Sequence, residues 1–284
     1  MWGATYLFSA MALEQIPAFA LCGWRYLAAG GITLLVGFIF TQPQKPSILE
    51  LRNAAIAGCL FMGLGATGAI WALYYLDTGL TALIIAGEPL VILLMLWMVD
   101  QERPPNRAFL GVFLGIIGMY LLVSQDNLVS TVDQWKGVVI ILLSMLAWGS
   151  GSIFVSRSAL PKSQLLNSGL QMLVGGLFSI CVSLLIGEEI LAYTSYTGLT
   201  IVSVSFLIVF GSIIAFTAFN YLLQNVSTEK VVTNTYVNPI VAMLLGYVFL
   251  GEMVTGLSIM AAGLMLTGVF FVNTSKGTKK KPQT

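Results

Sequence analysis

Apolar runs of about 20 residues follow one another along almost the whole chain, and each is long enough to cross a bilayer as a helix. Hydrophobic residues make up 57% of the sequence and charged residues only 9%, whereas soluble domains carry about 25% charged residues. Backbone groups in hydrocarbon must find hydrogen-bond partners within their own segment, which favours helices. The chain is therefore predicted to be an all-α, multi-pass membrane protein.

We predict ten transmembrane helices. They cover residues 1–13, 17–40, 53–75, 78–99, 107–123, 136–156, 165–186, 198–224, 230–250 and 256–272. The first is short, since residues 1–13 give only about 20 Å of helix. We favour a truncated first helix whose amino-terminal part precedes Met1, and a half-helix is the alternative. No basic segment precedes the apolar stretch, so a signal peptide is not expected.

The positions of Lys and Arg predict the orientation in the membrane. Apart from Arg25 and Lys136, all of the 13 basic residues lie in alternate loops or in the tail at residues 273–284. The intervening loops are mainly acidic. Because basic loops stay in the cytoplasm, both termini and the basic tail are expected to be cytoplasmic.

The chain also carries an internal repeat. Trp2-Gly3 matches Trp148-Gly149, and Glu88-Pro89 matches Asn238-Pro239 in the later helices. The two units are residues 1–123 and 136–272, with five predicted helices each. An odd number of helices means that the second unit enters the membrane upside down. Inverted repeats of this kind are typical of alternating-access transporters, whose binding site lies at the midplane.

Two charges lie deep in the predicted hydrocarbon, Arg25 and Glu88. Each is about nine residues, or roughly 13 Å, from the outer end of its helix, so their depths are similar. We hypothesise that they interact. One interpretation is a structural ion pair that fixes two helices, and the other is an acid that couples protons or holds a solute.

Polar and aromatic side chains recur at helical spacing in the third and eighth helices. Thr67, Trp71 and Tyr74 form one stripe, and Thr217, Asn220, Tyr221 and Gln224 form the other. Such stripes should face the bundle interior, either as contacts between helices or as the lining of a cavity. Pro89 and Pro239 are predicted helix kinks, with a hinge or an exposed carbonyl as the functional alternative.

Several chemistries find no support in the sequence. There is no histidine, and the three cysteines are dispersed through apolar runs. No nucleophilic triad, phosphate loop or metal cluster is recognisable, so no cofactor, no metal and no nucleic-acid partner is expected. An intramembrane enzyme would need a catalytic pair, and only Glu88 is available. A non-transporting scaffold or receptor is a further alternative.

The segment WGATYLFSAMALEQIPAFALCGWRYLAAGG resembles the opening of the EamA family in the drug/metabolite transporter superfamily. The motifs that resemble the family are Trp2 to Tyr6, Pro17 and Arg25 to Gly30. Glu88-Pro89, Asn238-Pro239 and the closing glutamates Glu102 and Glu252 are similar to its later motifs. The resemblance covers essentially the whole chain. Two departures are the shortened first helix and Asn238, where glutamate is common.

This resemblance implies a secondary transporter of the cytoplasmic membrane that is not an enzyme. It nominates cavity residues from the first, third and fourth helices and their repeat mates: Trp2, Trp71, Tyr74, Tyr75, Glu88, Trp148, Asn220, Tyr221, Asn234 and Asn238. Arg25 matches a common family position, which favours a structural role. With Arg25 as the sole predicted core cation, a small neutral, zwitterionic or amphipathic solute is expected rather than a phosphate ester. We expect export of amino-acid-like or drug-like solutes, while a homodimer stays open.

Overall fold

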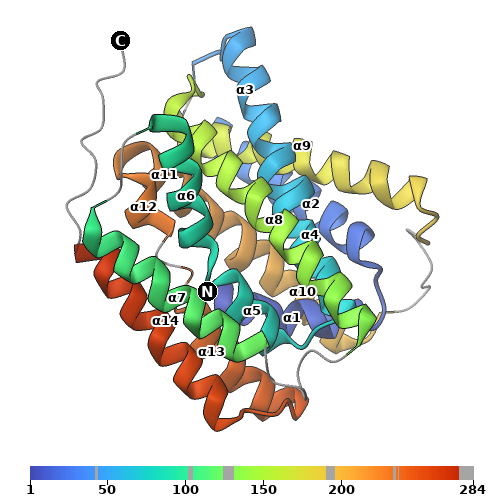
Figure 1. Cartoon of the computed structure of the whole chain (residues 1–284). Helices are drawn as coiled ribbons and strands as arrows, with labels where there is room; N and C mark the ends of the chain where they lie inside the picture. The colour runs from blue at the N-terminus through green and yellow to red at the C-terminus, as the bar shows by residue number, and fades with distance from the viewer. Residues whose placement is uncertain are drawn as a thin grey trace.

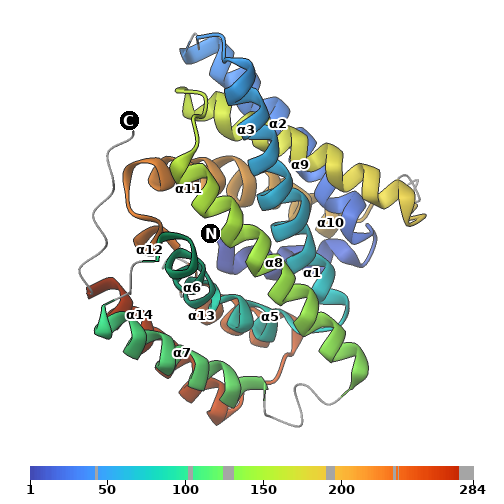
Figure 2. The ribbon, with the colours of Figure 1, turned by 45° about the horizontal axis from the view of Figure 1, so that its top comes forward.

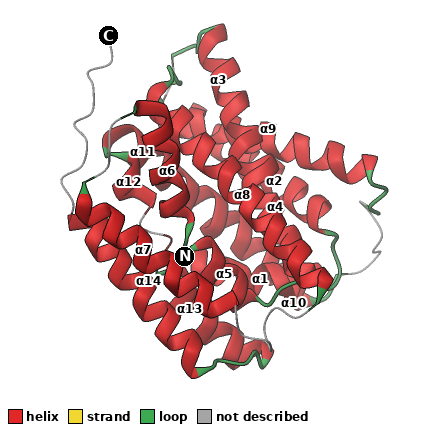
Figure 3. Cartoon of the chain, in the orientation of Figure 1, coloured by secondary structure: helices red, strands yellow, loops and turns green. Residues whose placement is uncertain are grey.

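The protein is all-helical in the computed structural model, which describes residues 1–41, 44–101, 105–123, 131–189, 196–232, 235 and 237–274. Within these ranges there is no β-strand (Figure 3). Six helices are long and apolar enough to cross a membrane: Ala18–Phe40, Ile48–Tyr74, Thr78–Asp100, Val132–Arg157, Gln164–Leu185 and Gly198–Asn225. Three shorter apolar helices follow, at Asn106–Gly118, Asn238–Leu250 and Gly256–Val272. The predicted all-α class is thus confirmed.

Helical segments make up most of the first half of the chain. They are α1 (Trp2–Leu13), α2 (Ala18–Thr41), α3 (Ile48–Gly58), the π-helical segment η1 (Cys59–Ala66), α4 (Thr67–Trp71), the 3-10 segment η2 (Ala72–Tyr74), α5 (Thr78–Ile85), α6 (Glu88–Asp100) and α7 (Asn106–Val123). Segments α3 to η2 follow one another without interruption, so the third predicted helix is a single rod with a π-helical middle.

The second half repeats this order. Its elements are α8 (Val132–Arg157), α9 (Gln164–Leu185), α10 (Gly198–Phe206), the π-helical segment η3 (Leu207–Ile214), α11 (Ala215–Asn225), α12 (Thr228–Val231), α13 (Asn238–Leu245), the π-helical segment η5 (Gly246–Leu250) and α14 (Gly256–Thr274). The π-helical segments η1 and η3 occupy matching places in the two halves. Such segments are rare and often mark functional sites.

The predicted kinks at Pro89 and Pro239 fall where a new helical segment begins. Helix α5 ends at Ile85, and α6 begins at Glu88 with Pro89 in its first turn. Pro239 likewise lies in the first turn of α13. The first turn tolerates proline because its N–H groups have no partner within the helix, whereas an interior proline removes a hydrogen bond. The chain therefore stops one helix and starts another.

Two pairs of helices, each joining one half to the other, pack along their lengths (Figures 1 and 2). Helix α2 lies on α9, and α7 lies on α14. A Cβ atom on Gly111 would lie 2.3 Å from the Gly268 carbonyl oxygen, and one on Gly268 would lie 2.5 Å from that of Gly111. Backbones in contact through small residues are typical of membrane helix packing, which lacks a hydrophobic driving force between helices.

Aromatic rings from both halves meet at the centre of the molecule. The ring centroids of Trp2 and Trp148 are 5.6 Å apart, and those of Phe61 and Trp148 are 4.9 Å apart, both in edge-to-face arrangements. Phe216 and Phe219 complete the cluster. Edge-to-face contacts stabilise by about 0.5–1.5 kcal/mol each beyond the burial of area. This cluster holds α1 and α8 beside the cavity described next.

Candidate functional site

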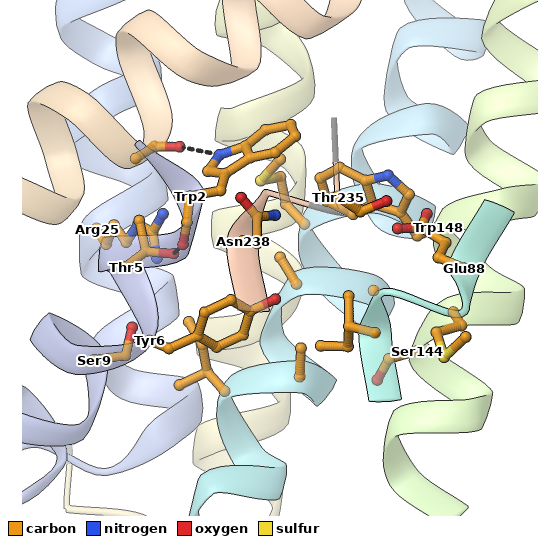
Figure 4. A pocket seen from close by; sticks show the side chains of 18 of the residues that line it. Trp2, Thr5, Tyr6, Ser9, Arg25, Glu88, Ser144, Trp148, Thr235 and Asn238 are labelled. Carbon is orange, nitrogen blue, oxygen red and sulfur yellow. Dashed lines mark hydrogen bonds between the residues drawn. The ribbon is translucent and has the colours of Figure 1, made fainter. Parts of the chain in front are cut away.

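A cavity of about 100 Å³ lies between the two halves (Figure 4). Its lining comes from α1, α2, η1, α4, α5, α6, α8, η3, α13 and the residue Thr235 that precedes α13. The residues are Trp2, Thr5, Tyr6, Ser9, Arg25, Tyr26, Met62, Gly65, Ala66, Ala69, Ile70, Ile85, Glu88, Ser144, Met145, Trp148, Gly211, Thr235 and Asn238. Of the residues nominated from the sequence, Trp2, Glu88, Trp148 and Asn238 are brought together here.

Helix α1 supplies one polar face to the cavity. Trp2, Thr5, Tyr6 and Ser9 follow the spacing at which helical side chains share a face. The Trp2 indole N–H donates to the carbonyl oxygen of Gly211 in η3 at 2.9 Å. The buried Ser9 hydroxyl makes no hydrogen bond within the described part of the chain. The sequence interpretation missed Thr5, Tyr6 and Ser9, although their spacing from Trp2 was a usable signal.

Glu88 lies at the start of α6 and is 3% exposed. Its Oε1 has no hydrogen-bond partner among the described residues. Helix amino termini favour negative charge, because their first N–H groups point outward from the helix. Even so, a buried carboxylate without a partner is costly. Its carboxylate can therefore take up a proton, or accept a hydrogen bond from an ammonium group that enters the cavity.

Arg25 reaches the same cavity from α2 and is 4% exposed. Its Nε donates to Ser212 Oγ at 2.8 Å, and its guanidinium carbon lies 4.9 Å from the centroid of the Tyr26 ring. Ser212 in turn donates to the Leu207 carbonyl oxygen, five residues earlier in the π-helical segment η3. The irregular helix thus holds the arginine in place.

The predicted ion pair between Arg25 and Glu88 does not form. Among the described residues, the ion pairs are Lys136–Asp133 and Arg157–Asp100. In Figure 4 the two side chains lie on opposite sides of the cavity. Similar depth in the membrane made the pair plausible, but depth does not fix the separation within the plane of the membrane. Arg25 and Glu88 are therefore both available to a molecule that enters the cavity between them.

Asn238 is the counterpart of Glu88 in the second half and begins α13. It is 8% exposed and lines the same cavity, next to Thr235. The amino termini of two half-helices therefore meet at one site, one with an acid and one with an amide. Discontinuous helices whose amino termini point at a midplane site are a recurring way to bind solutes in transporters.

Other nominated residues of the third helix lie outside the cavity lining. Trp71 packs on Phe19, with ring centroids 5.5 Å apart. The Tyr74 hydroxyl accepts a hydrogen bond of 3.1 Å from the backbone N–H of Ala18. Tyr75 lies against Gly137 of α8, where an added Cβ would come within 2.9 Å of the tyrosine Cβ. These side chains make contacts between helices, the first of the two predicted interpretations of the stripe.

The nominated residues of the eighth and ninth helices differ in environment. Asn220 is fully buried and donates to Gln171 Oε1 at 3.1 Å and to Ser168 Oγ at 3.3 Å, both on α9. Tyr221 is 54% exposed. Asn234 lies outside the described residues. A polar stripe faces the bundle interior whether its residues bond to another helix or line a cavity. The sequence alone therefore does not distinguish these two roles.

Apolar helices long enough to span a membrane, and a central cavity that holds one buried charge of each sign, indicate a multi-pass membrane protein of the transporter class. The model of the EamA-like transporter family matches residues 1–124 and 135–274. The chain belongs to this family, and the resemblance found in the sequence is confirmed.

Three curated relatives match nearly the whole chain. One is the "Uncharacterized inner membrane transporter YedA" of Escherichia coli (strain K12), 32% identical over 97% of this chain and 88% of the relative. Another is the "Uncharacterized transporter YvbV" of Bacillus subtilis (strain 168), 25% identical over 99% and 90% of the two chains. "Protein PecM" of Dickeya dadantii (strain 3937) is 25% identical over 96% and 86%.

A solved structure described as "Crystal structure of protein" has the same fold. Its TM-score is 0.71 at 17% sequence identity, and the match covers 95% of this chain and 91% of that one. At this identity the likeness supports the fold alone.

Proposed function

We propose that the protein is a secondary transporter that moves a small solute across the cytoplasmic membrane by alternating access around the cavity. The observation that carries this proposal is the meeting of Glu88 and Asn238, at the starts of two half-helices from different halves, in one central cavity. A site between two halves can be exposed to either side when they move relative to each other.

The contacts between helices support an inverted repeat of ten spans. Helix α1 packs on η3 and α13, and its counterpart α8 packs on η1 and α6. Helix α2 packs on η3, and its counterpart α9 packs on η1. Exchanging the halves turns each contact into another one in the set, as a twofold axis requires. The family match in two stretches is consistent with units at 1–123 and 136–272.

The proposed location is the cytoplasmic membrane, with both termini in the cytoplasm. The name of the YedA relative gives it as an inner membrane transporter, and the apolar helices of this chain suit the same environment. The distribution of Lys and Arg along the sequence supports the orientation.

The cavity favours a small zwitterionic or amphipathic solute. Arg25 and Glu88 contribute one charge of each sign and are not paired with each other. A solute with an ammonium group and an acceptor group could satisfy both. The rings of Trp2, Tyr6 and Trp148 suit its apolar part. A doubly charged phosphate ester would find only one cation. We propose that the protein exports its solute. The candidate modes of transport are proton coupling, substrate exchange and facilitated diffusion.

Comparing metabolites in overexpressing and deletion cells identifies solute candidates, which are then measured in proteoliposomes with and without an imposed pH gradient. Flux that depends on the protein and is lost in Glu88→Gln supports the proposal. Flux that is the same with and without the pH gradient would exclude proton coupling. No flux with any solute that accumulates in the deletion cells would favour a scaffold or receptor instead.

A further inference from the structure

Three polar side chains at one end of the helix bundle cap helices of the opposite half. They are Gln15, in the turn after α1, Glu188, after α9, and Glu252, after η5. Together with the helix starts that they cap (Ala18, Thr78 and Thr197), we call this end the cross-capped face. Each cap joins a side chain of one half to backbone N–H groups of the other, so each is sensitive to relative movement of the halves.

Glu252 makes the most extensive of these caps. Its carboxylate accepts hydrogen bonds from the backbone N–H of Thr78 at 2.9 Å and of Gly79 at 3.0 Å. It also accepts the Thr78 hydroxyl, at 2.7 and 2.9 Å to its two oxygens. An added Cβ on Gly246 would lie 2.3 Å from Glu252 Oε2. The glycine therefore provides the space in which the carboxylate meets α5, the half-helix that leads to Glu88.

Glu188 makes an equivalent cap at the start of α2. Its Oε2 accepts the backbone N–H of Ala20 at 2.9 Å, and its Oε1 accepts that of Phe19 at 3.3 Å. Ser183 donates to the same carboxylate at 2.8 Å. Helix α2 carries Arg25 two turns further along, so the cap fixes the amino terminus of the helix that places the cavity guanidinium.

Gln15 caps in the reverse sense, from the first half to the second. Its side-chain oxygen accepts the backbone N–H of Thr197 at 2.9 Å, and the hydroxyl of Thr200 at 2.5 Å. These residues start α10, which continues into the π-helical segment η3 beside the cavity. All three caps thus act on segments that lead to cavity residues.

The opposite end of the bundle is joined differently. Asp100 and Arg157 form an ion pair of 2.8 Å whose side chains are 35% and 41% exposed. Asn53 Nδ2 donates to the Ala159 carbonyl oxygen at 3.0 Å. Exposed ion pairs contribute little because water and salt screen them. Carboxylates bound to helix amino termini are stronger, since the hydrogen bonds are charge-assisted.

We infer that the three caps close the cavity toward the cross-capped face, and that a solute reaches this face only after they separate. This rests on the proposed function. A hydrogen bond weakens steeply beyond about 3.5 Å, so a movement of about 1 Å between the halves releases a cap. The freed N–H groups then need other partners, which water supplies as this face opens. Capping therefore favours the closed state.

The experiment measures access rather than transport. A reporter cysteine, Ser144→Cys, is placed in the cavity after Cys22, Cys59 and Cys181 have been replaced by alanine. A small membrane-impermeant methanethiosulfonate is added to one side of the membrane at a time, and the labelling rate is followed. From the cross-capped side we expect slow labelling that rises roughly 5- to 30-fold in Glu252→Ala, the factor that corresponds to one to two kcal/mol.

Three further variants keep the test decisive. Thr78→Val removes only the hydroxyl bonds to Glu252 and should give a smaller rise, which serves if Glu252→Ala folds poorly. Glu189→Ala removes the exposed neighbour of Glu188 and should change nothing. Met253→Cys, 73% exposed in the loop after Glu252, reports that the reagent reaches this face.

Unchanged Ser144→Cys labelling in both Glu252→Ala and Thr78→Val, while Met253→Cys reacts, would overturn the inference. An equal rise in Glu189→Ala would also overturn it. Because labelling needs no solute, the result is separate from the proposed function. Altered labelling without flux would support the caps and contradict transport, and flux with unaltered labelling would do the reverse.

Discussion

Glu88 and Asn238 each begin a half-helix, and the two side chains line one cavity although they belong to different halves of the chain. The acid has an oxygen without a hydrogen-bond partner among the described residues. Across the cavity, Arg25 is held by Ser212 rather than by the acid. The site thus presents separated charges of opposite sign, together with two helix amino termini, to whatever enters it.

Replacement of Glu88 by glutamine should abolish most transport while leaving the fold intact. The amide keeps the shape of the side chain but cannot balance a cation, so we expect solute affinity or flux to fall at least 10-fold, or about 1.4 kcal/mol. Flux into proteoliposomes and the unfolding temperature are the two measurements. Glu189→Gln is the matched control, because it removes an exposed acid. Equal flux in wild type and Glu88→Gln would contradict a role for the acid in the cavity.

A methyl group on Gly111 should destabilise the contact between α7 and α14. The added Cβ would lie 2.3 Å from the Gly268 carbonyl oxygen, so the helices must separate. We expect Gly111→Ala to cost about 1–3 kcal/mol and lower the unfolding temperature in detergent.

The control for this change lies on the partner helix. An added Cβ on Gly263 would meet no atom within 4 Å, so Gly263→Ala should be neutral or slightly stabilising because alanine favours helix. If Gly111→Ala and Gly263→Ala have equal unfolding temperatures, the packing of α7 on α14 is not as close as described.

The sequence predicted the helical architecture because the hydrophobic pattern repeats at the length of a membrane span, and spans must be helical in lipid. It also placed Glu88 and Asn238 at corresponding points of the repeat. It predicted kinks at Pro89 and Pro239, and each proline lies in the first turn of a helical segment, α6 or α13. Proline disfavours a helix interior whether the chain bends there or starts a new segment, and only the neighbouring backbone decides which one forms.

Residue pairing was harder to predict than depth. Arg25 and Glu88 lie at similar depth, but the direction in which a helix face points depends on its rotation about the axis. The π-helical segments η1 and η3 alter the rotation of the residues that follow them, Tyr74 and Asn220 among them, and no residue pattern in the sequence signalled these segments. Asn220 and Tyr74 show the same difficulty, since each bonds to another helix rather than to the cavity.

Ser212→Ala should weaken solute binding through the orientation of Arg25. The serine hydroxyl accepts the Arg25 Nε hydrogen bond at 2.8 Å, and its loss leaves a buried donor without that partner. Such a loss costs about 1–3 kcal/mol, so we expect affinity for the transported solute to fall about 5- to 150-fold. Ser150→Ala is the control, since among the described residues Ser150 bonds only to the carbonyl oxygen one turn earlier. Equal affinity in the two variants would show that Ser212 does not position the guanidinium.

Asp77→Asn should raise stability at neutral pH, with a gain that disappears in acid. Burial, and to a smaller extent the nearby charge of Glu252, raise the pKa of Asp77 in the folded protein above its ordinary value of 3.8. The folded state therefore holds the proton more tightly than the unfolded state, and stability falls as the pH rises from 3.8 through the folded pKa. Asp77 makes no capping hydrogen bond to α5, because Glu252 provides the cap, so the amide loses nothing there. Unfolding temperatures measured from acidic to neutral pH should show the two proteins converging below the ordinary pKa and separating above it. A constant difference at all pH values, or a less stable variant at neutral pH, would contradict this account of the Asp77 environment.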